Sequence, residues 1–313
     1  MDRLSKFRQT AKSLLALAVT CTALATFVSA ATPGDSCCGA SNGSCCDCLW
    51  CRDTLFSWEG LFDVREEQED PNEEKAFELD RPDFVEASST VGLGRVVIES
   101  GYSYSFNNDG GVQTVSHSYP ETLIRVGLLA EWFEFRIAQN IAHEQQRSGG
   151  ITSRASGAED LYLGCKLALT KQAEWLPEMA LIPQMTVPTG DADFTDDEVL
   201  PGANWVYSWQ LTELWDMGGS TQGNRAIDAT ANDYLEMSQA WAFGYAVADD
   251  ARVYVEWFGF FPHGADVAKP EHYGDVGLAW FLTPDLEVDV RFGIGLNEVA
   301  DDYFTGLGGG IRF

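Results

Sequence analysis

Six cysteines lie close together near the start of the chain, in the stretch CCGASNGSCCDCLWC. Thiolates spaced as in Cys48-x-x-Cys51 can ligate zinc, and paired thiols can instead form disulfides. No histidine lies nearby, and the signal peptide described below implies an oxidising compartment, so disulfides are favoured over a metal site. The disulfide candidates are Cys37, Cys38, Cys45, Cys46, Cys48 and Cys51.

Other residue types that could perform catalysis are sparse. The four histidines (His117, His143, His263 and His272) show no metal-ligand spacing, and no phosphate-binding, calcium-binding or dinucleotide motif is present. Ser116-His117-Ser118 offers a serine beside a histidine, the pairing that a lipid-modifying barrel enzyme would need. A loop histidine between serines is more typical of no chemistry, so we expect no enzyme, no metal and no cofactor.

Charged residues that alternate with apolar ones are the third candidate set. In LEVDVRFGIGL, the apolar positions from Leu286 to Leu296 share one face, and Asp289 and Arg291 share the other. Charges on the inner face of a barrel either set the selectivity of a water-filled lumen or close it by pairing. The residues that we expect to line such a lumen are Glu99, Arg125, Glu134, Arg136, Lys166, Glu256, Asp289, Arg291 and Arg312.

Positioning these charges requires strands, and period-two runs fill the chain after residue 84. About twelve runs are separated by polar or Gly/Pro/Asn/Asp turns. They cover residues 95–106, 122–130, 133–141, 159–170, 177–187, 203–214, 218–228, 234–247, 251–260, 272–282, 286–296 and 303–313.

Three features favour a membrane barrel over a soluble sandwich. Tryptophan and tyrosine gather near strand ends, as the aromatic girdles of outer-membrane barrels do. The polar face mixes both signs of charge with glycine. Short turns such as 248–250 alternate with long polar loops such as 189–202. No internal apolar run reaches the roughly 18 residues of a membrane helix, so the expected fold is an all-β transmembrane antiparallel barrel of outer-membrane type.

The N-terminal quarter of the chain divides into three parts before the barrel. Residues 1–30 have a basic start, an apolar core and a small-residue cleavage site, which predicts a cleaved signal peptide. Residues 31–52 form the Cys-rich segment, residues 53–82 an acidic linker, and residues 83–313 the barrel. The net charge of −28 argues against nucleic acid as a partner. We expect outer-membrane lipid, the barrel assembly machinery and a small-molecule solute instead.

The chain ends on a strand, DYFTGLGGGIRF, rather than on a polar tail. Its terminal Phe313, with Ile311 two residues before and Gly308 further in, fits the pattern by which assembly machinery reads last strands. The face of Gly306, Gly308 and Gly310 is predicted to be the lumen side, where close packing favours the absence of a side chain.

Four stretches together resemble a known family. They are DRPDFVEAS…VGLGRVVIESGYSYS, ETLIRVGLLAEWFEFRI, GAEDLYLGCKLAL…LPEMALIPQMTVPTG and LEVDVRFGIGLNEVADDYFTGLGGGIRF. They are similar to the outer-membrane "MetA-pathway of phenol degradation" family. The resemblance implies a barrel and a transport role and no catalytic residues. The cysteine cluster, the acidic linker, Cys165 and Lys166 depart from the family pattern.

The sequence thus predicts an outer-membrane channel or transporter, through which small, hydrophobic or aromatic solutes diffuse passively. Two alternatives remain. One is a structural, envelope-anchoring barrel whose lumen is plugged by paired charges, since about twelve strands leave little free bore. The other is a barrel enzyme that modifies lipids.

Overall fold

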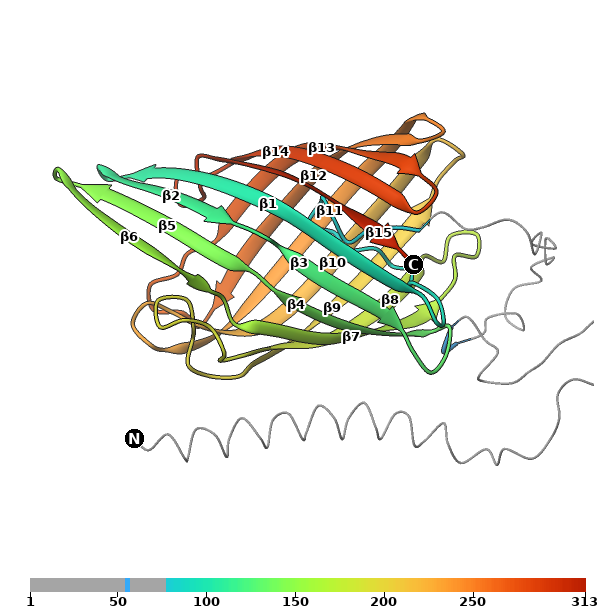
Figure 1. The fold of residues 1–313 in the computed structure, drawn as a ribbon, viewed down its shortest axis with the longest axis horizontal. Helices are drawn as coiled ribbons and strands as arrows, with labels where there is room; N and C mark the ends of the chain where they lie inside the picture. Colours follow the sequence, from blue (N-terminus) through green and yellow to red (C-terminus); the bar gives the residue numbers. More distant parts are fainter. Residues whose placement is uncertain (1–53, 57–76) are drawn as a thin grey trace, which may run out of the picture.

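The computed structural model describes residues 54–56 and 77–313, so the predicted signal peptide, the Cys-rich segment and most of the acidic linker lie outside the described residues. The described part is built from antiparallel strands, which are tilted and close into a barrel (Figure 1). No helix in these residues has the length and hydropathy needed to cross a membrane.

The strands follow one another around the barrel in an order close to that of the chain. They are β1 (Val96–Asp109), β2 (Val112–Ser118), β3 (Thr122–Gly127), β4 (Phe133–Gln139), β5 (Ile141–Ser148), β6 (Ile151–Ala158), β7 (Leu161–Thr170), β8 (Glu178–Val187), β9 (Leu200–Gln210), β10 (Trp215–Ile227), β11 (Asp233–Ala248), β12 (Ala251–His263), β13 (Glu271–Thr283), β14 (Leu286–Gly295) and β15 (Tyr303–Arg312). The ring runs β1–β3–β4–β7 and then from β8 to β15, which pairs with β1. The closed barrel therefore has 12 strands, which confirms the predicted fold.

Strands β2, β5 and β6 extend the wall beyond one end of this ring. They continue β3, β4 and β7 after short interruptions, and they form with the outer half of β1 a four-stranded extension opposite the end that holds the C-terminus (Figure 1). One interruption lies at Tyr119-Pro120-Glu121, where Pro120 has no N–H to donate to the ladder. All twelve predicted ranges overlap a strand of the ring; β2, β5 and β6 were missed as strands of their own.

The two faces of the wall have the polarity of a membrane barrel. Outward-facing Val276, Phe292 and Leu307 remain about half exposed, at 52%, 51% and 58%. Asp275 of β13 and Asp289 of β14 face inward and are buried. A soluble sandwich would bury the apolar face instead, so the predicted direction of the alternation is correct.

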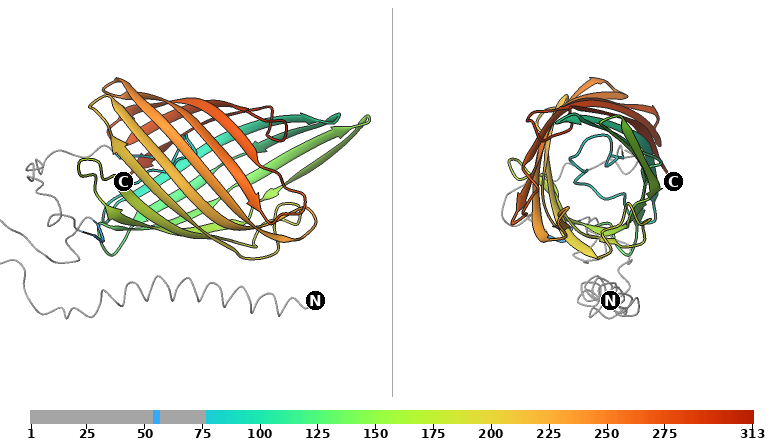
Figure 2. Two further views of the ribbon diagram at one scale, coloured as in Figure 1. Left: turned by 180° about the vertical axis from the view of Figure 1, so that it is seen from behind. Right: turned by 90° about the vertical axis from the view of Figure 1, so that its left-hand side faces the viewer.

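The packed interior of the barrel is formed by the chain that precedes β1. Residues 77–91 enter the ring and cross its interior, as the view along the barrel shows (Figure 2, right). Phe77, Leu79 and Val91 pack with Val97 of β1, and Val85 packs with residues of β11, β12 and β13. We call residues 77–91 the plug. Residues 77–82 fall at the end of the range predicted as linker, and they lie inside the barrel.

Candidate functional site

The backbone of the plug is held by carboxylates of the barrel wall. The plug forms no strand ladder, so its buried N–H groups need other acceptors. Glu99 of β1 accepts the N–H of Asp80 at 3.1 Å. Glu256 of β12 accepts the N–H groups of Phe84 and Val85 at 2.8 and 2.9 Å. These contacts fix the path of the plug at two separate places on the barrel wall.

Cations of the wall bind the carbonyl groups of the same segment. Arg125 of β3 donates through Nη1 to the carbonyl oxygen of Glu78 at 2.8 Å. Lys166 of β7 donates through Nζ to the carbonyl oxygens of Ala87 and Ser89 at 2.7 and 3.3 Å. Charged hydrogen bonds of this kind are roughly twice as strong as neutral ones. The wall therefore supplies both the donors and the acceptors that the plug backbone lacks.

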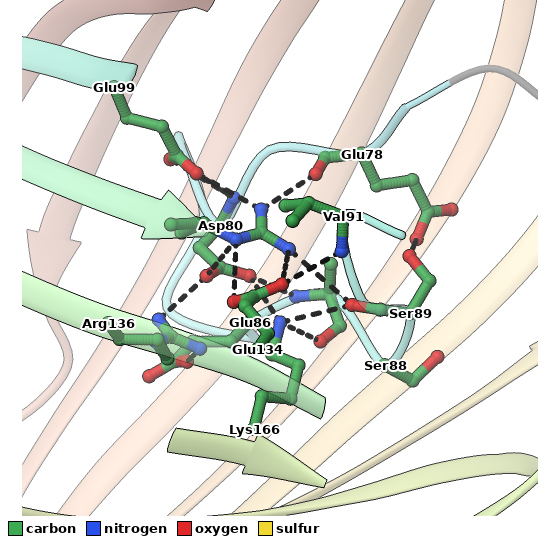
Figure 3. A network of polar contacts seen from close by, with 12 residues as sticks. Glu78, Asp80, Glu86, Ser88, Ser89, Val91, Glu99, Glu134, Arg136 and Lys166 are labelled. Atoms are coloured by element: carbon green, nitrogen blue, oxygen red, sulfur yellow. Dashed lines mark hydrogen bonds and ion pairs between the residues drawn. The ribbon is translucent and has the colours of Figure 1, made fainter. Parts of the chain in front are cut away.

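Asp80 lies at the centre of the network (Figure 3). Its carboxylate contacts Nη2 of Arg136 at 2.6 Å, Nζ of Lys166 at 3.0 Å and Nε of Arg125 at 3.3 Å. Burial alone would raise the pKa of this carboxyl, but the three surrounding cations outweigh burial and hold the pKa of Asp80 well below its ordinary value. Asp80 is therefore an anion that three wall residues on β3, β4 and β7 share.

Three further carboxylates contact these cations. Oε1 of Glu99 lies 3.1 Å from Nη1 of Arg125. Glu134 of β4 receives Nε and Nη2 of Arg125 at 2.9 and 3.2 Å, and it also accepts the N–H of Val91 at 2.9 Å. Glu86 of the plug pairs with Nη1 of Arg136 at 2.7 Å. Burying this many charges is tolerated because each one has a partner.

Glycines of β1 and β15 make room for the plug. A Cβ atom on Gly308 would lie 2.6 Å from Nε of Arg81, and one on Gly310 would lie 2.5 Å from Cδ2 of Leu79. Both distances are shorter than real Cβ contacts allow. The glycine face that the sequence places on the lumen side is thus bare because Arg81 and Leu79 pack against it.

An open cavity of about 440 Å³ lies in the lumen between the plug and the strand extension. One side is aromatic: Phe84 of the plug stacks on Phe258 with ring centroids 4.8 Å apart, and Phe258 stacks on Tyr273 at 5.0 Å. Serines of β1 and β2 also line the cavity. Among the lining atoms, Oγ of Ser103, Oγ of Ser118 and Nε of Arg291 are buried and have no hydrogen-bond partner.

Such a cavity suits a small molecule with an apolar ring and a few polar atoms. Aromatic side chains offer stacking surfaces, and polar atoms without partners offer hydrogen bonds that fix the orientation of a ligand. The described residues hold no group of three or more His, Cys, Asp or Glu arranged to bind a metal. The geometry thus supports binding or passage of a solute.

The family model described as "Putative MetA-pathway of phenol degradation" matches residues 79–313. The chain belongs to this family. The match begins inside the plug, so the family region includes the network around Asp80 as well as the barrel. No curated protein matches the sequence.

One of three compared membrane barrels resembles this member of the MetA-pathway family in fold. An outer membrane channel from Pseudomonas putida F1 superposes with a TM-score of 0.58 at 14% identity, over 72% of this chain and 98% of that one. The translocator domain of the autotransporter NalP from Neisseria meningitidis gives 0.49 at 11% identity, over 71% and 89%. An anion-selective porin from Comamonas acidovorans gives 0.35 at 10% identity, over 70% and 98%.

The nine residues predicted to line the lumen lie on the inner side of the family barrel. Eight of them contact the plug. Asp289 pairs with Arg81, and Arg312 lies over the ring of Phe77. The other six are Glu99, Arg125, Glu134, Arg136, Lys166 and Glu256. Arg291 borders the cavity and lies over the ring of Phe304, and it also lines a second pocket together with Arg81 and Asp83 of the plug.

Sequence reasoning missed the partners of these charges. Asp80, Arg81 and Glu86 belong to a segment without periodicity, which gives no indication that it enters a lumen. The available signal was indirect: the predicted inner face carried many ionisable residues, and buried charges require partners. The structure also brings His117 and His143 directly opposite each other on β2 and β5.

The predicted assembly signal lies at the seam of the barrel. The N–H of Phe313 donates to the carbonyl oxygen of Val96 at 2.8 Å, and the N–H of Val96 donates back at 3.1 Å. The side chains of Ile311 and Phe313 point outward and remain 37% and 66% exposed. Gly308 lies on the inner side against Arg81.

Proposed function

We propose that the protein is a channel of the outer membrane that passes small, hydrophobic or aromatic solutes by diffusion, and that the plug closes the lumen in the structure described here. The aromatic cavity beside the plug is the observation that carries this proposal. It is large enough for a single-ring compound, and Phe84 of the plug forms part of its wall. A solute that binds there contacts the plug directly, which couples solute binding to plug position.

The proposal includes a route and an orientation. A signal peptide exports the chain, and the end that holds the C-terminus faces the periplasm, as the short turns at residues 249–250 and 284–285 suggest. The strand extension then lies at the extracellular side, and solutes reach the cavity from there. Movement of the plug opens the way to the periplasm.

Liposome swelling tests the transport proposal. Proteoliposomes are challenged with solutes of equal size and graded polarity, from sugars to single-ring aromatic alcohols and acids. We expect faster swelling with aromatic solutes than with sugars of similar mass, and Phe84→Ala should reduce the difference because it removes the stacking partner of Phe258. Flat traces with every solute would contradict the proposal.

The structural, anchoring alternative is favoured by one specific observation, the dense ion network around Asp80. A lumen that never opens would give no conductance under any condition and in any plug variant. The conductance experiments in the Discussion therefore distinguish the two functions.

The geometry gives no support to Ser116-His117-Ser118 as an enzyme site. Ser116 and Ser118 face inward with Ser105 and Ser103, whereas His117 faces outward with Tyr104. The hydroxyls and the imidazole are thus on opposite faces of β2. We propose a channel rather than an enzyme.

Asp83 of the plug makes closure depend on pH. Burial raises the pKa of Asp83 to about 7, with Asp275 adding to this effect and Arg252 and Arg291 opposing it. A carboxyl whose pKa is raised by docking favours the docked plug when it is protonated. Docking is therefore strongest near pH 4, weakens as the pH rises toward 7 and changes little above that value.

We expect higher single-channel conductance, or a higher open probability, at pH 8 than at pH 5. Asp83→Asn should remove this part of the pH dependence, because the amide stays neutral throughout. Asp249→Asn, in an exposed turn, is the matched control and should leave the pH profile unchanged. An unaltered profile in Asp83→Asn would show that Asp83 does not control closure.

A further inference from the structure

His117 and His143 form a cross-strand pair on the outer face of the strand extension. They lie directly opposite each other in the β2–β5 register, although 26 positions separate their numbers. Side chains of opposed residues in an antiparallel pair start from Cβ atoms about 4.5–5.5 Å apart. Two imidazoles at this separation can reach one ion between them.

A hydroxyl group holds one nitrogen of each ring. Oη of Tyr102 lies 2.7 Å from Nδ1 of His117, and Oγ of Ser156 lies 2.7 Å from Nδ1 of His143. Tyr102 belongs to β1 and Ser156 to β6, which flank the β2–β5 pair on its two sides. Each Nδ1 therefore faces a hydroxyl of a flanking strand, which leaves Nε2 of each ring outside these two contacts.

Aromatic contacts restrict the two rings further. Tyr119 stacks on His143 with centroids 4.8 Å apart and an interplanar angle of 15°. Tyr104 meets His117 edge to face at 5.2 Å. In the described part of the chain, Nε2 of neither ring has a hydrogen-bond partner, so both remain available as ligands.

We propose that His117 and His143 bind one divalent transition-metal ion, Cu²⁺ or Zn²⁺, through their Nε2 atoms. Water molecules complete the coordination. Neutral imidazole is a ligand for copper, zinc and nickel, whereas calcium and magnesium prefer oxygen. Tyr102 and Ser156 act as the outer-shell partners that fix tautomer and ring orientation in histidine metal sites. The bound ion would link β2 to β5 outside the lumen, and this inference does not depend on the proposed function.

A serine–histidine hydrolytic pair at the same place is less well supported. Ser156 contacts Nδ1 of His143, but no carboxylate or amide among the described residues contacts Nε2 to orient the ring. A general base of that kind requires such a third group. The same free nitrogen is what a metal ligand needs.

Titration calorimetry of the full chain, stripped of metal and held in detergent micelles, tests the site. The probes are CuSO₄ and ZnCl₂, with CaCl₂ and MgCl₂ for comparison. We expect native protein to bind one equivalent of copper and zinc more than His143→Gln or His117→Gln does, with copper bound more tightly. Comparing variants within the same full chain cancels any metal that the cysteines take up.

Two further variants distinguish a metal site from a structural role. His272→Gln, whose ring stacks on Trp257 elsewhere, should keep the full stoichiometry. Tyr102→Phe should keep the site but weaken binding by roughly 10- to 100-fold, because it removes the hydrogen bond to Nδ1. Nitrogen couplings from two imidazoles in the Cu²⁺ paramagnetic resonance spectrum of native protein provide evidence that needs no variant. Equal metal uptake by native protein and His143→Gln, or a spectrum without two coupled nitrogens, would overturn the proposal.

Discussion

Asp80→Asn is expected to raise the conductance of the protein in planar bilayers from a closed baseline to frequent openings. The substitution keeps the size of the side chain but removes the charge that Arg125, Arg136 and Lys166 share. Lys166 then loses the carboxylate that it contacts, while Arg125 keeps Glu134 and Arg136 keeps Glu86.

The size of this effect follows from the cost of a buried charge without a partner. Removing one member of a buried ion pair costs about 3–5 kcal/mol. Because about 1.4 kcal/mol corresponds to a factor of ten, the ratio of undocked to docked plug should rise by roughly two to three and a half powers of ten. Single-channel recording measures that shift as open probability.

Glu198→Gln is the matched control for Asp80→Asn. Glu198 pairs with Arg225 at 2.6 Å, but both side chains are partly exposed, and such pairs contribute little to stability. We expect this variant to behave as the native protein does. Closed traces from assembled Asp80→Asn protein would show that the ion network does not hold the lumen shut.

Deleting Phe313 is expected to lower the amount of protein in the outer membrane several-fold or more. The deletion removes both backbone hydrogen bonds to Val96, which extend the seam between β15 and β1. The ring itself is 66% exposed, so its burial contributes little to folding within the chain. A large effect of the ring would therefore indicate recognition during assembly rather than packing.

Phe313→Ser separates the two contributions. It keeps the backbone hydrogen bonds and removes the ring, so membrane levels should still fall if the terminal aromatic residue is read by the assembly machinery. Immunoblots of the outer-membrane fraction measure the level, and Val267→Ser, an exposed loop position, is the control. Native levels of Phe313→Ser would limit the role of this residue to the seam.

Periodicity allowed the ring of strands and the direction of its faces to be predicted. The runs that begin at Leu286 and Tyr303 have large apolar side chains on one face and charged residues or glycine on the other. In the structure the apolar face points outward and the other face points into the lumen. The extension strands β2, β5 and β6 were missed because their sequences, VQTVSHS, IAHEQQRS and ITSRASGA, have polar residues on both faces. Without an apolar face, period two gives no signal.

The plug could not be predicted for a different reason. Its structure is set by contacts with residues that are far away in the sequence. Glu256 accepts the N–H of Phe84, and Asp289 forms an ion pair with Arg81. A segment held by wall side chains needs no periodicity of its own. The inward charges were predicted from local alternation, whereas their partners depend on the closed barrel.

The same limit applies to His117 and His143. Their numbers show no ligand spacing, and their proximity follows from the β2–β5 register, which in turn depends on strands that the pattern missed.

The most direct test of plug closure is a reversible lock between plug and wall. A Cβ atom on Gly218 of β10 would lie 3.1 Å from Cγ1 of Val85, a separation suited to a disulfide between cysteines at these positions. The test protein combines Val85→Cys and Gly218→Cys with Asp80→Asn, and serine replaces the six N-terminal cysteines. We predict closed traces from the oxidised protein and openings after a reducing agent is added. Equal conductance before and after reduction, with the disulfide verified, would contradict closure by the plug.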